Sequence, residues 1–215
     1  DGLDPAMAAG LGCRVATAYR AVADRARVVG GESVVVIGAG GVGLAAVAVA
    51  RSRGARVCAV DVSAASLDRA LDQGADEVVD ASIGRDKVIA AVTHWAGGGV
   101  DVSVDALGSP EACRTGILSL GRRGRHVQVG LLPPAAGRAD IPMERVSGWE
   151  LDVLGSHGMA AADYPALLDD IASRRLDLRA MIAPGEPLGL EEAGAALVAM
   201  GSTPSRGIVL IDPTR

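Results

Sequence analysis

The apolar residues of this chain fall into short runs that alternate with amphipathic stretches. Six runs are too short to be buried helices and are typical of buried strands: 34–37, 56–60, 76–79, 100–104, 124–129 and 151–154. Apolar residues at helical spacing predict helices between and after them, over 63–73, 85–95, 111–120 and 161–174, and a short one over 190–200. Strands that alternate with helices predict an α/β fold, a doubly wound parallel six-stranded sheet.

A glycine cluster follows the first of these runs. The segment Gly38, Ala39, Gly40, Gly41, Val42, Gly43 leads into an Ala/Val-rich helical stretch that reaches about residue 53. In a strand–turn–helix unit the first glycine permits a sharp turn, the second lets backbone N–H groups approach a pyrophosphate, and the third lets the helix pack closely on the strand. The pattern predicts a Rossmann-like dinucleotide site, with a plain strand–helix turn as the alternative.

Asp61 stands at the end of the second run, about 20 residues beyond the glycines. Its carboxylate is placed to accept hydrogen bonds from the adenosine ribose hydroxyls and would repel a 2′-phosphate, which favours NAD over NADP. The alternative is an ordinary N-cap, because a helix follows.

Other residues at strand ends are candidates for the wall of the same site, because ligands of open α/β sheets bind beyond the carboxyl ends of the strands. They are Val42, Ala106, Leu107, Val129, Gly130 and Leu131. Core packing is the alternative for each apolar member. His94 and His126 are expected at the surface or at a strand end, without a chemical role.

Composition narrows the function. The formal net charge of −5 offers no basic surface for nucleic acid or an anionic membrane, and no apolar run is long enough to span a bilayer. Three widely spaced cysteines, Cys13, Cys58 and Cys113, favour reduced thiols in the cytoplasm over a disulfide framework.

Four segments together carry a resemblance to a known family: 12–22 (GCRVATAYRAV), 38–43, 104–108 (VDALG) and 155–159 (GSHGM). The chain resembles the zinc-dependent alcohol dehydrogenases of the medium-chain dehydrogenase/reductase superfamily. The resemblance implies an NAD-binding Rossmann domain over 31–175, flanked by remnants of a catalytic domain: its end and a linking helix at 1–30, and a C-terminal return to it at 176–215. Most of the catalytic domain would lie upstream. Residues 207–211 are expected to form a strand with a partner elsewhere.

The resemblance also implies roles for three residues. Cys13 matches a ligand of the catalytic zinc, whose preceding Cys and His ligands would lie upstream; the alternative is a small buried apolar residue. Thr17, one helical turn later, would lie against the nicotinamide as a catalytic-site residue, or else be a core threonine. His157 would lie near the nicotinamide carboxamide, or else cap a strand end. Ser66 departs from the family members that carry a lysine near this place, which weakens the NAD assignment without reversing it.

The function implied is hydride transfer between NAD and an alcohol, or the matching aldehyde or ketone, by a zinc-dependent homo-oligomer. A dimer or tetramer is expected, with pairing through the edge strand at 151–154. This sequence by itself is expected to bind coenzyme without turnover. Two alternatives remain: a noncatalytic nucleotide-binding module, and a zinc-free quinone or enoyl reductase of the same superfamily, against which Cys13 counts.

Overall fold

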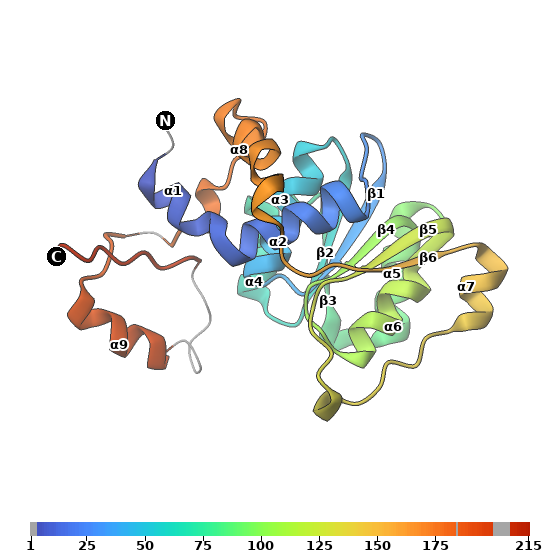
Figure 1. Cartoon of the computed structure of the whole chain (residues 1–215). Helices are drawn as coiled ribbons and strands as arrows, with labels where there is room; N and C mark the ends of the chain where they lie inside the picture. The colour runs from blue at the N-terminus through green and yellow to red at the C-terminus, as the bar shows by residue number, and fades with distance from the viewer. Residues whose placement is uncertain (1–3, 184, 200–206) are drawn as a thin grey trace.

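The computed structural model describes residues 4–183, 185–199 and 207–215. Its centre is a six-stranded sheet in which every pairing is parallel, in the order β3-β2-β1-β4-β5-β6 (Figure 1). The strands are β1 (Ser33–Ile37), β2 (Arg56–Asp61), β3 (Glu77–Asp80), β4 (Val100–Asp105), β5 (Leu120–Gln128) and β6 (Asp152–Gly155). The predicted Rossmann-like α/β fold is confirmed.

Helices cover both faces of this sheet. They are α3 (Gly41–Ser52), α4 (Ala64–Asp72), α5 (Arg85–Ala96), α6 (Pro110–Ser119), α7 (Met143–Trp149) and α8 (Tyr164–Ala172). Local signals place their first turns: Ser63 caps α4 by accepting a hydrogen bond from the Ser66 N–H, and Ser109 caps α6, whose first residue is Pro110.

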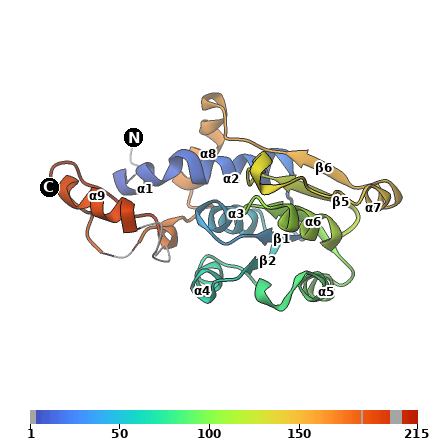
Figure 2. The same ribbon diagram turned by 90° about the horizontal axis from the view of Figure 1, so that it is seen from below.

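The central strand β1 shows why the apolar runs are continuous. All five of its residues are buried, because successive side chains point to opposite faces and both faces are covered. Val34 and Val36 pack into a cluster with α3 and α8, whereas Val35 and Ile37 pack into a second cluster with α5 and α6. Figure 2 shows α8 and α5 on opposite sides of the sheet.

An irregular helix precedes the sheet. It begins as α1 (Pro5–Gly10), continues as α2 (Ala16–Tyr19), and contains two segments with π-helical hydrogen bonds, Leu11–Val15 and Arg20–Arg25. The first of these segments is kinked at Gly12, whose backbone angles, φ −47° and ψ −110°, are not helical. Its apolar side chains join the cluster around α3. Such π-helical turns inside a helix are often found at functional sites.

Two expectations about local structure were wrong, and one helix was not predicted. Residues 143–149 form α7, for which no expectation was made. Strand β5 begins at Leu120, four residues before the expected start. Residues 207–211 form no strand; Ile208 and Ile211 make isolated parallel bridges to Ile182 and Leu188. Short apolar runs far from a sheet do not specify pairing by themselves.

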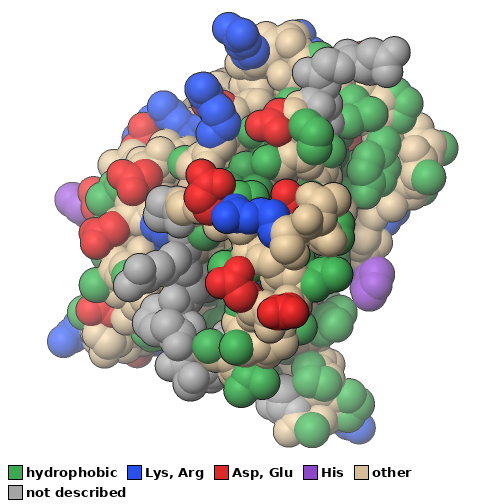
Figure 3. All heavy atoms as spheres, turned by 90° about the vertical axis from the view of Figure 1, so that its left-hand side faces the viewer, with side chains coloured by type: hydrophobic (Ala, Val, Ile, Leu, Met, Phe, Trp, Pro, Cys, Tyr) green, Lys and Arg blue, Asp and Glu red, His purple; other side chains and the backbone are tan. Residues whose placement is uncertain are grey.

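The C-terminal helix α9 (Leu190–Ala199) lies beyond the sheet in both ribbon views and buries none of its residues (Figures 1 and 2). Leu190, Leu197 and Val198 are exposed. The face of the molecule on this side mixes apolar with acidic and basic side chains (Figure 3). In the part of the chain that the structure describes, no helix is long and apolar enough to cross a membrane.

Candidate coenzyme site

The strand order reverses between β1 and β4, which are neighbours at the centre of the sheet. The connection from β1 runs through α3 on one face, and the connection from β4 runs through α6 on the other. The connections that leave the carboxyl ends of β1 and β4 therefore turn to opposite faces of the sheet. This is the place where α/β proteins bind their ligands. The glycine turn of residues 38–43 lies at this point.

Each glycine of the turn has a different environment. Gly38 has φ +91°, which favours glycine, and a Cβ atom on Gly43 would overlap the carbonyl oxygen of Gly38. A Cβ on Gly40 would meet nothing within 4 Å. Gly43 is thus required by helix–strand packing, while Gly40 borders open space that a ligand can enter.

The N-terminus of α3 faces this space. No acidic residue stands in its first turn and no side chain caps it. Among the described residues, none accepts a hydrogen bond from the N–H of Gly41 or Val42. These free donors and the positive end of the helix dipole fit a diphosphate.

Asp61 lies at the end of β2, beside the glycine turn. Its Oδ2 accepts a hydrogen bond of 2.7 Å from the Ala39 N–H, and its Oδ1 accepts one of 2.9 Å from the Ser63 N–H. The carboxylate therefore connects the glycine turn to Ser63, the residue that caps α4. Each oxygen keeps a lone pair for a ribose hydroxyl.

The expected wall residues come together at the ends of β4 and β5. Leu107 contacts Gly38, and Gly108 packs against Gly130 and Leu131. Leu107 is 63% exposed and Leu131 is 68% exposed, whereas Ala106 and Val129 are partly buried against the core. The set therefore divides: the two leucines are exposed, and Ala106 and Val129 pack against the core.

One residue that the sequence analysis missed joins these loops. The Oδ1 atom of Asp105 accepts hydrogen bonds of 2.8 Å from the N–H groups of Leu107 and Gly108, and its carbonyl accepts from those of Val129 and Gly130. Asp105 is fully buried. Its place at the end of an apolar run, before a turn, was a signal that could have indicated this role.

A buried chain of hydrogen bonds continues from Asp105. Its Oδ2 accepts from Gln128, whose amide oxygen lies 3.2 Å from His126 Nε2; the other nitrogen of His126 lies 2.8 Å from the hydroxyl of Ser103. Parallel register places Ser103 beside His126 and Asp105 beside Gln128. Expecting His126 at the surface or a strand end was wrong, since it is fully buried, and burial lowers its pKa.

The three thiols differ in exposure. Burial, and secondarily a nearby carboxylate, raises the pKa of Cys58 to about 12 and that of Cys113 to about 11, so both stay protonated. Cys13 is free and exposed in the first π-helical segment. Thr17 is buried, although it follows Cys13 by only four residues.

Residues 4–183, 185–199 and 207–215 contain no group of three His, Cys, Asp or Glu side chains that could hold a metal ion. A catalytic zinc site uses three protein ligands. Cys13 alone does not provide such a site.

His157 lies in the loop after β6, with its side chain exposed. Its carbonyl oxygen accepts a hydrogen bond of 2.9 Å from Arg20, and the carbonyl of Gly155 accepts one from Arg25. Both arginines belong to the second π-helical segment, so this segment fixes the loop. A role of His157 at the nicotinamide stays a prediction.

Comparisons with known proteins define the family. The fold and its glycine turn belong to the Rossmann-like class, and the family model described as zinc-binding dehydrogenase matches residues 41–173, more than half of the chain. A probable D-xylulose reductase A from Aspergillus terreus is 34% identical over 167 residues, which are 75% of this chain and 46% of that protein. The chain belongs to the zinc-binding dehydrogenase family, as the resemblance to medium-chain alcohol dehydrogenases implied.

Solved structures of dehydrogenases have a similar fold. The 2R,3R-butanediol dehydrogenase of Bacillus subtilis superposes with a TM-score of 0.87 at 26% identity, covering 99% of this chain and 59% of that one. An NAD-dependent alcohol dehydrogenase superposes with a TM-score of 0.78 at 27% identity, covering 93% and 56%. The chain spans about half the length of the curated relatives it matches.

Proposed function

We propose that this chain binds NAD as the coenzyme-binding part of a zinc-dependent alcohol dehydrogenase. One observation carries the proposal: an open glycine turn lies at the strand-order reversal, with Asp61 bonded to its backbone from the neighbouring strand. The diphosphate would lie on the N–H groups of Gly41 and Val42. The nicotinamide would lie toward Leu107 and Leu131.

NAD, rather than NADP, is proposed because of the charge at the ribose position. We place the adenosine ribose at the Asp61 carboxylate, beside the glycine turn, where a 2′-phosphate would be repelled by a second negative charge. The name of the NAD-dependent structural relative supports the same choice.

Titration with NADH and NADPH, followed by nicotinamide fluorescence, tests the proposal. NADH should bind more tightly than NADPH. Asp61→Asn retains an oxygen for the Ala39 N–H but removes the charge, so it should weaken NADH binding by about 10-fold and narrow the gap to NADPH. Asp80→Asn is a matched control, since Asp80 ends β3 and bonds the Ser82 N–H in the same way. Equal loss in both variants, or no binding of NADH to the unaltered chain, would contradict the proposal.

For the longer protein we propose hydride transfer between the nicotinamide and an alcohol or carbonyl substrate. The names of the relatives, a xylulose reductase and a butanediol dehydrogenase, support this substrate class. Cys13 is proposed as one zinc ligand in that protein. No other metal ligand joins it among the described residues, so this chain by itself fixes no zinc geometry, and the proposal includes no reaction step on zinc. Thr17 and His157 are proposed to border the nicotinamide. The 215-residue chain is expected to form no NADH from alcohols, which absorbance at the NADH band would check.

The surroundings of the site support three further proposals. Residues 31–175 form the coenzyme domain, and the segment 176–215, whose helix α9 leaves apolar side chains exposed, returns to a catalytic domain. The outer edge of β6, where Val153 is 39% exposed, pairs subunits into a homodimer. Free cysteines suit the cytoplasm. Sedimentation that shows only monomer at micromolar concentration would exclude the dimer for this chain.

A further inference from the structure

Arg14 lies directly on the glycine turn, although 27 positions separate it from Gly41. A Cβ atom on Gly41 would lie 2.5 Å from Cδ, 2.9 Å from Nε and 3.2 Å from Cζ of Arg14. The absence of a side chain at Gly41 therefore makes room for this arginine. It comes from the first π-helical segment, Leu11–Val15, which contacts α3.

A small cavity separates Arg14 from a second arginine. The cavity measures about 20 Å³ and is lined by Arg14, Gly40, Gly41 and Leu44, by Arg69 of α4, and by Met181, Gly207 and Ile208 of the C-terminal segment. The Nε atom of Arg69 is buried and has no hydrogen-bond partner among the described residues, and its Nη2 donates a hydrogen bond of 3.4 Å to the Ser66 hydroxyl. Of the acidic residues that the structure describes, none forms an ion pair with Arg14 or Arg69.

This arrangement places two arginines at one cavity, neither of them paired with an acidic side chain in the part of the chain that the structure describes. The N-terminus of α3 already carries the positive end of the helix dipole, where a cation is unfavourable and an anion is favourable. Arg14 and Arg69 add two positive charges at a cavity beside this helix end. Charged groups that are partly buried need a charged or hydrogen-bonding partner, so this cavity favours an anion. The uncapped N–H of Gly41 borders the same cavity, so an anion bound by the glycine turn would lie beside the two guanidinium groups.

We propose that Arg14 binds the diphosphate of the dinucleotide. Its guanidinium lies against Gly41 of the glycine turn, and Arg69 lines the same cavity from α4. This inference rests on the proposed function and adds a cationic contact that neither the glycine motif nor Asp61 supplies.

Isothermal titration of the 215-residue chain with ADP-ribose and with adenosine tests the inference. Arg14→Met retains the apolar stem over Gly41 but removes the charge. It should weaken ADP-ribose binding by about 10-fold or more, and adenosine binding by less than about 2-fold. Arg14→Lys should recover part of the loss. The dependence of ADP-ribose affinity on salt should become shallower in Arg14→Met.

Arg56→Met is the matched control. Arg56 begins β2 at the other end of the strand from the glycine turn, lies over the ring of Trp95 at 4.9 Å, and forms no ion pair with a described residue. Its loss should leave both affinities unchanged. Circular dichroism of each variant confirms that the fold is retained.

The outcomes separate this inference from the proposed function. If Arg14→Met binds ADP-ribose as tightly as the unaltered chain, which itself binds NADH, the inference is wrong and the proposed function stands. Equal losses for ADP-ribose and adenosine would assign Arg14 a packing role and also overturn it. If the unaltered chain binds neither NADH nor ADP-ribose, both fail.

Discussion

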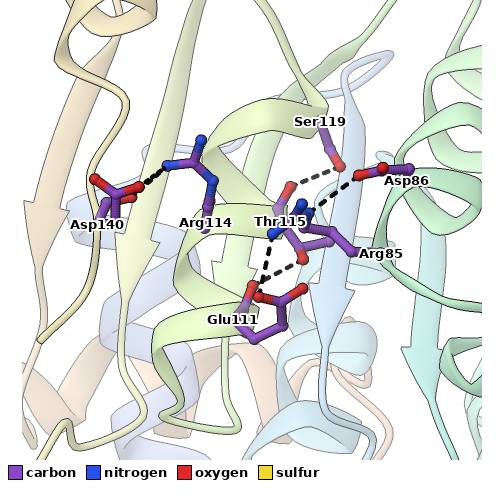
Figure 4. A network of polar contacts seen from close by, with 7 residues as sticks. All are labelled: Arg85, Asp86, Glu111, Arg114, Thr115, Ser119 and Asp140. Carbon is purple, nitrogen blue, oxygen red and sulfur yellow. Dashed lines mark hydrogen bonds and ion pairs between the residues drawn. The ribbon is translucent and has the colours of Figure 1, made fainter. Parts of the chain in front are cut away.

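The arginines on the outer faces of α5 and α6 differ in environment from those at the glycine turn. Arg114 bonds Asp140 at 2.6 Å, and Arg85 lies 3.1 Å from Asp86 and 3.4 Å from Glu111 (Figure 4). Their acidic partners are largely solvent-exposed. Arg14 and Arg69, by contrast, line a cavity and form no ion pair with a described residue.

The two regions show two uses of the same side chain. Exposed ion pairs contribute little to stability, because water screens them and ordering the side chains costs entropy. At the glycine turn the backbone leaves no room for a side chain at Gly43, and the cations remain available for an anion. Substitutions at the turn and in the loops beside it should therefore change stability and NADH affinity more than substitutions on α5 and α6. The predictions below run from the largest expected effect to the smallest.

The largest effect is expected from Gly43→Ala. The new Cβ would overlap the carbonyl oxygen of Gly38, so α3 must move away from β1. The free energy of unfolding should fall by about 3 kcal/mol, and NADH binding should be lost. Urea denaturation measures the first effect. Gly40→Ala, with nothing within 4 Å of its Cβ, should change stability by less than about 1 kcal/mol; similar losses in both would mean that packing does not distinguish the two glycines.

Asp105→Asn should have the next largest effect. The amide retains one acceptor for the Leu107 and Gly108 N–H groups, but its NH₂ then faces the donor amide of Gln128. Burial makes such an unpaired donor costly, so the free energy of unfolding should fall by about 2 kcal/mol. NADH affinity should fall as well, because the loops that carry Leu107 and Leu131 lose their common anchor. An unchanged denaturation midpoint would show that this network is not needed.

His126 predicts a moderate effect that depends on pH. Burial lowers its pKa in the folded chain below the ordinary value of 6.5, so near and below pH 6.5 the unfolded chain binds a proton that the folded chain does not. Its contribution to stability is therefore present above pH 6.5 and is lost as pH falls, by at most about 1.4 kcal/mol per pH unit. His126→Asn should flatten the dependence measured by denaturation between pH 5 and 7. The exposed His94 serves as control, and His94→Gln should leave the slope as it is.

The smallest effect is expected from Arg114→Ala on α6. Its exposed pair with Asp140 should be worth less than about 0.5 kcal/mol, and NADH affinity should not change. Thermal denaturation and the fluorescence titration check the two statements. A loss of NADH affinity comparable to that of the Arg14 variants would remove the distinction between paired and unpaired arginines.

The sequence by itself determined the layout of this protein. Buried parallel strands must be continuously apolar, and helices between them must show helical spacing, so the run 34–37 and the turn after it indicated the fold and the dinucleotide site. The place of Asp61 beside the glycine turn could be predicted for the same reason, since it depends on a neighbouring strand and a short spacing. Its role at the ribose stays a prediction. These features depend on residues that lie close together in the sequence.

Only the tertiary structure decided which distant residues meet at the site. The hydrogen bonds of Asp105 to Gln128, and through it to His126, exist because β4 and β5 pair in one register, which no local pattern specifies. Arg14 reaches Gly41 because a π-helical segment packs on α3 and glycine leaves space there. Such contacts follow from packing between elements, and packing depends on the whole fold.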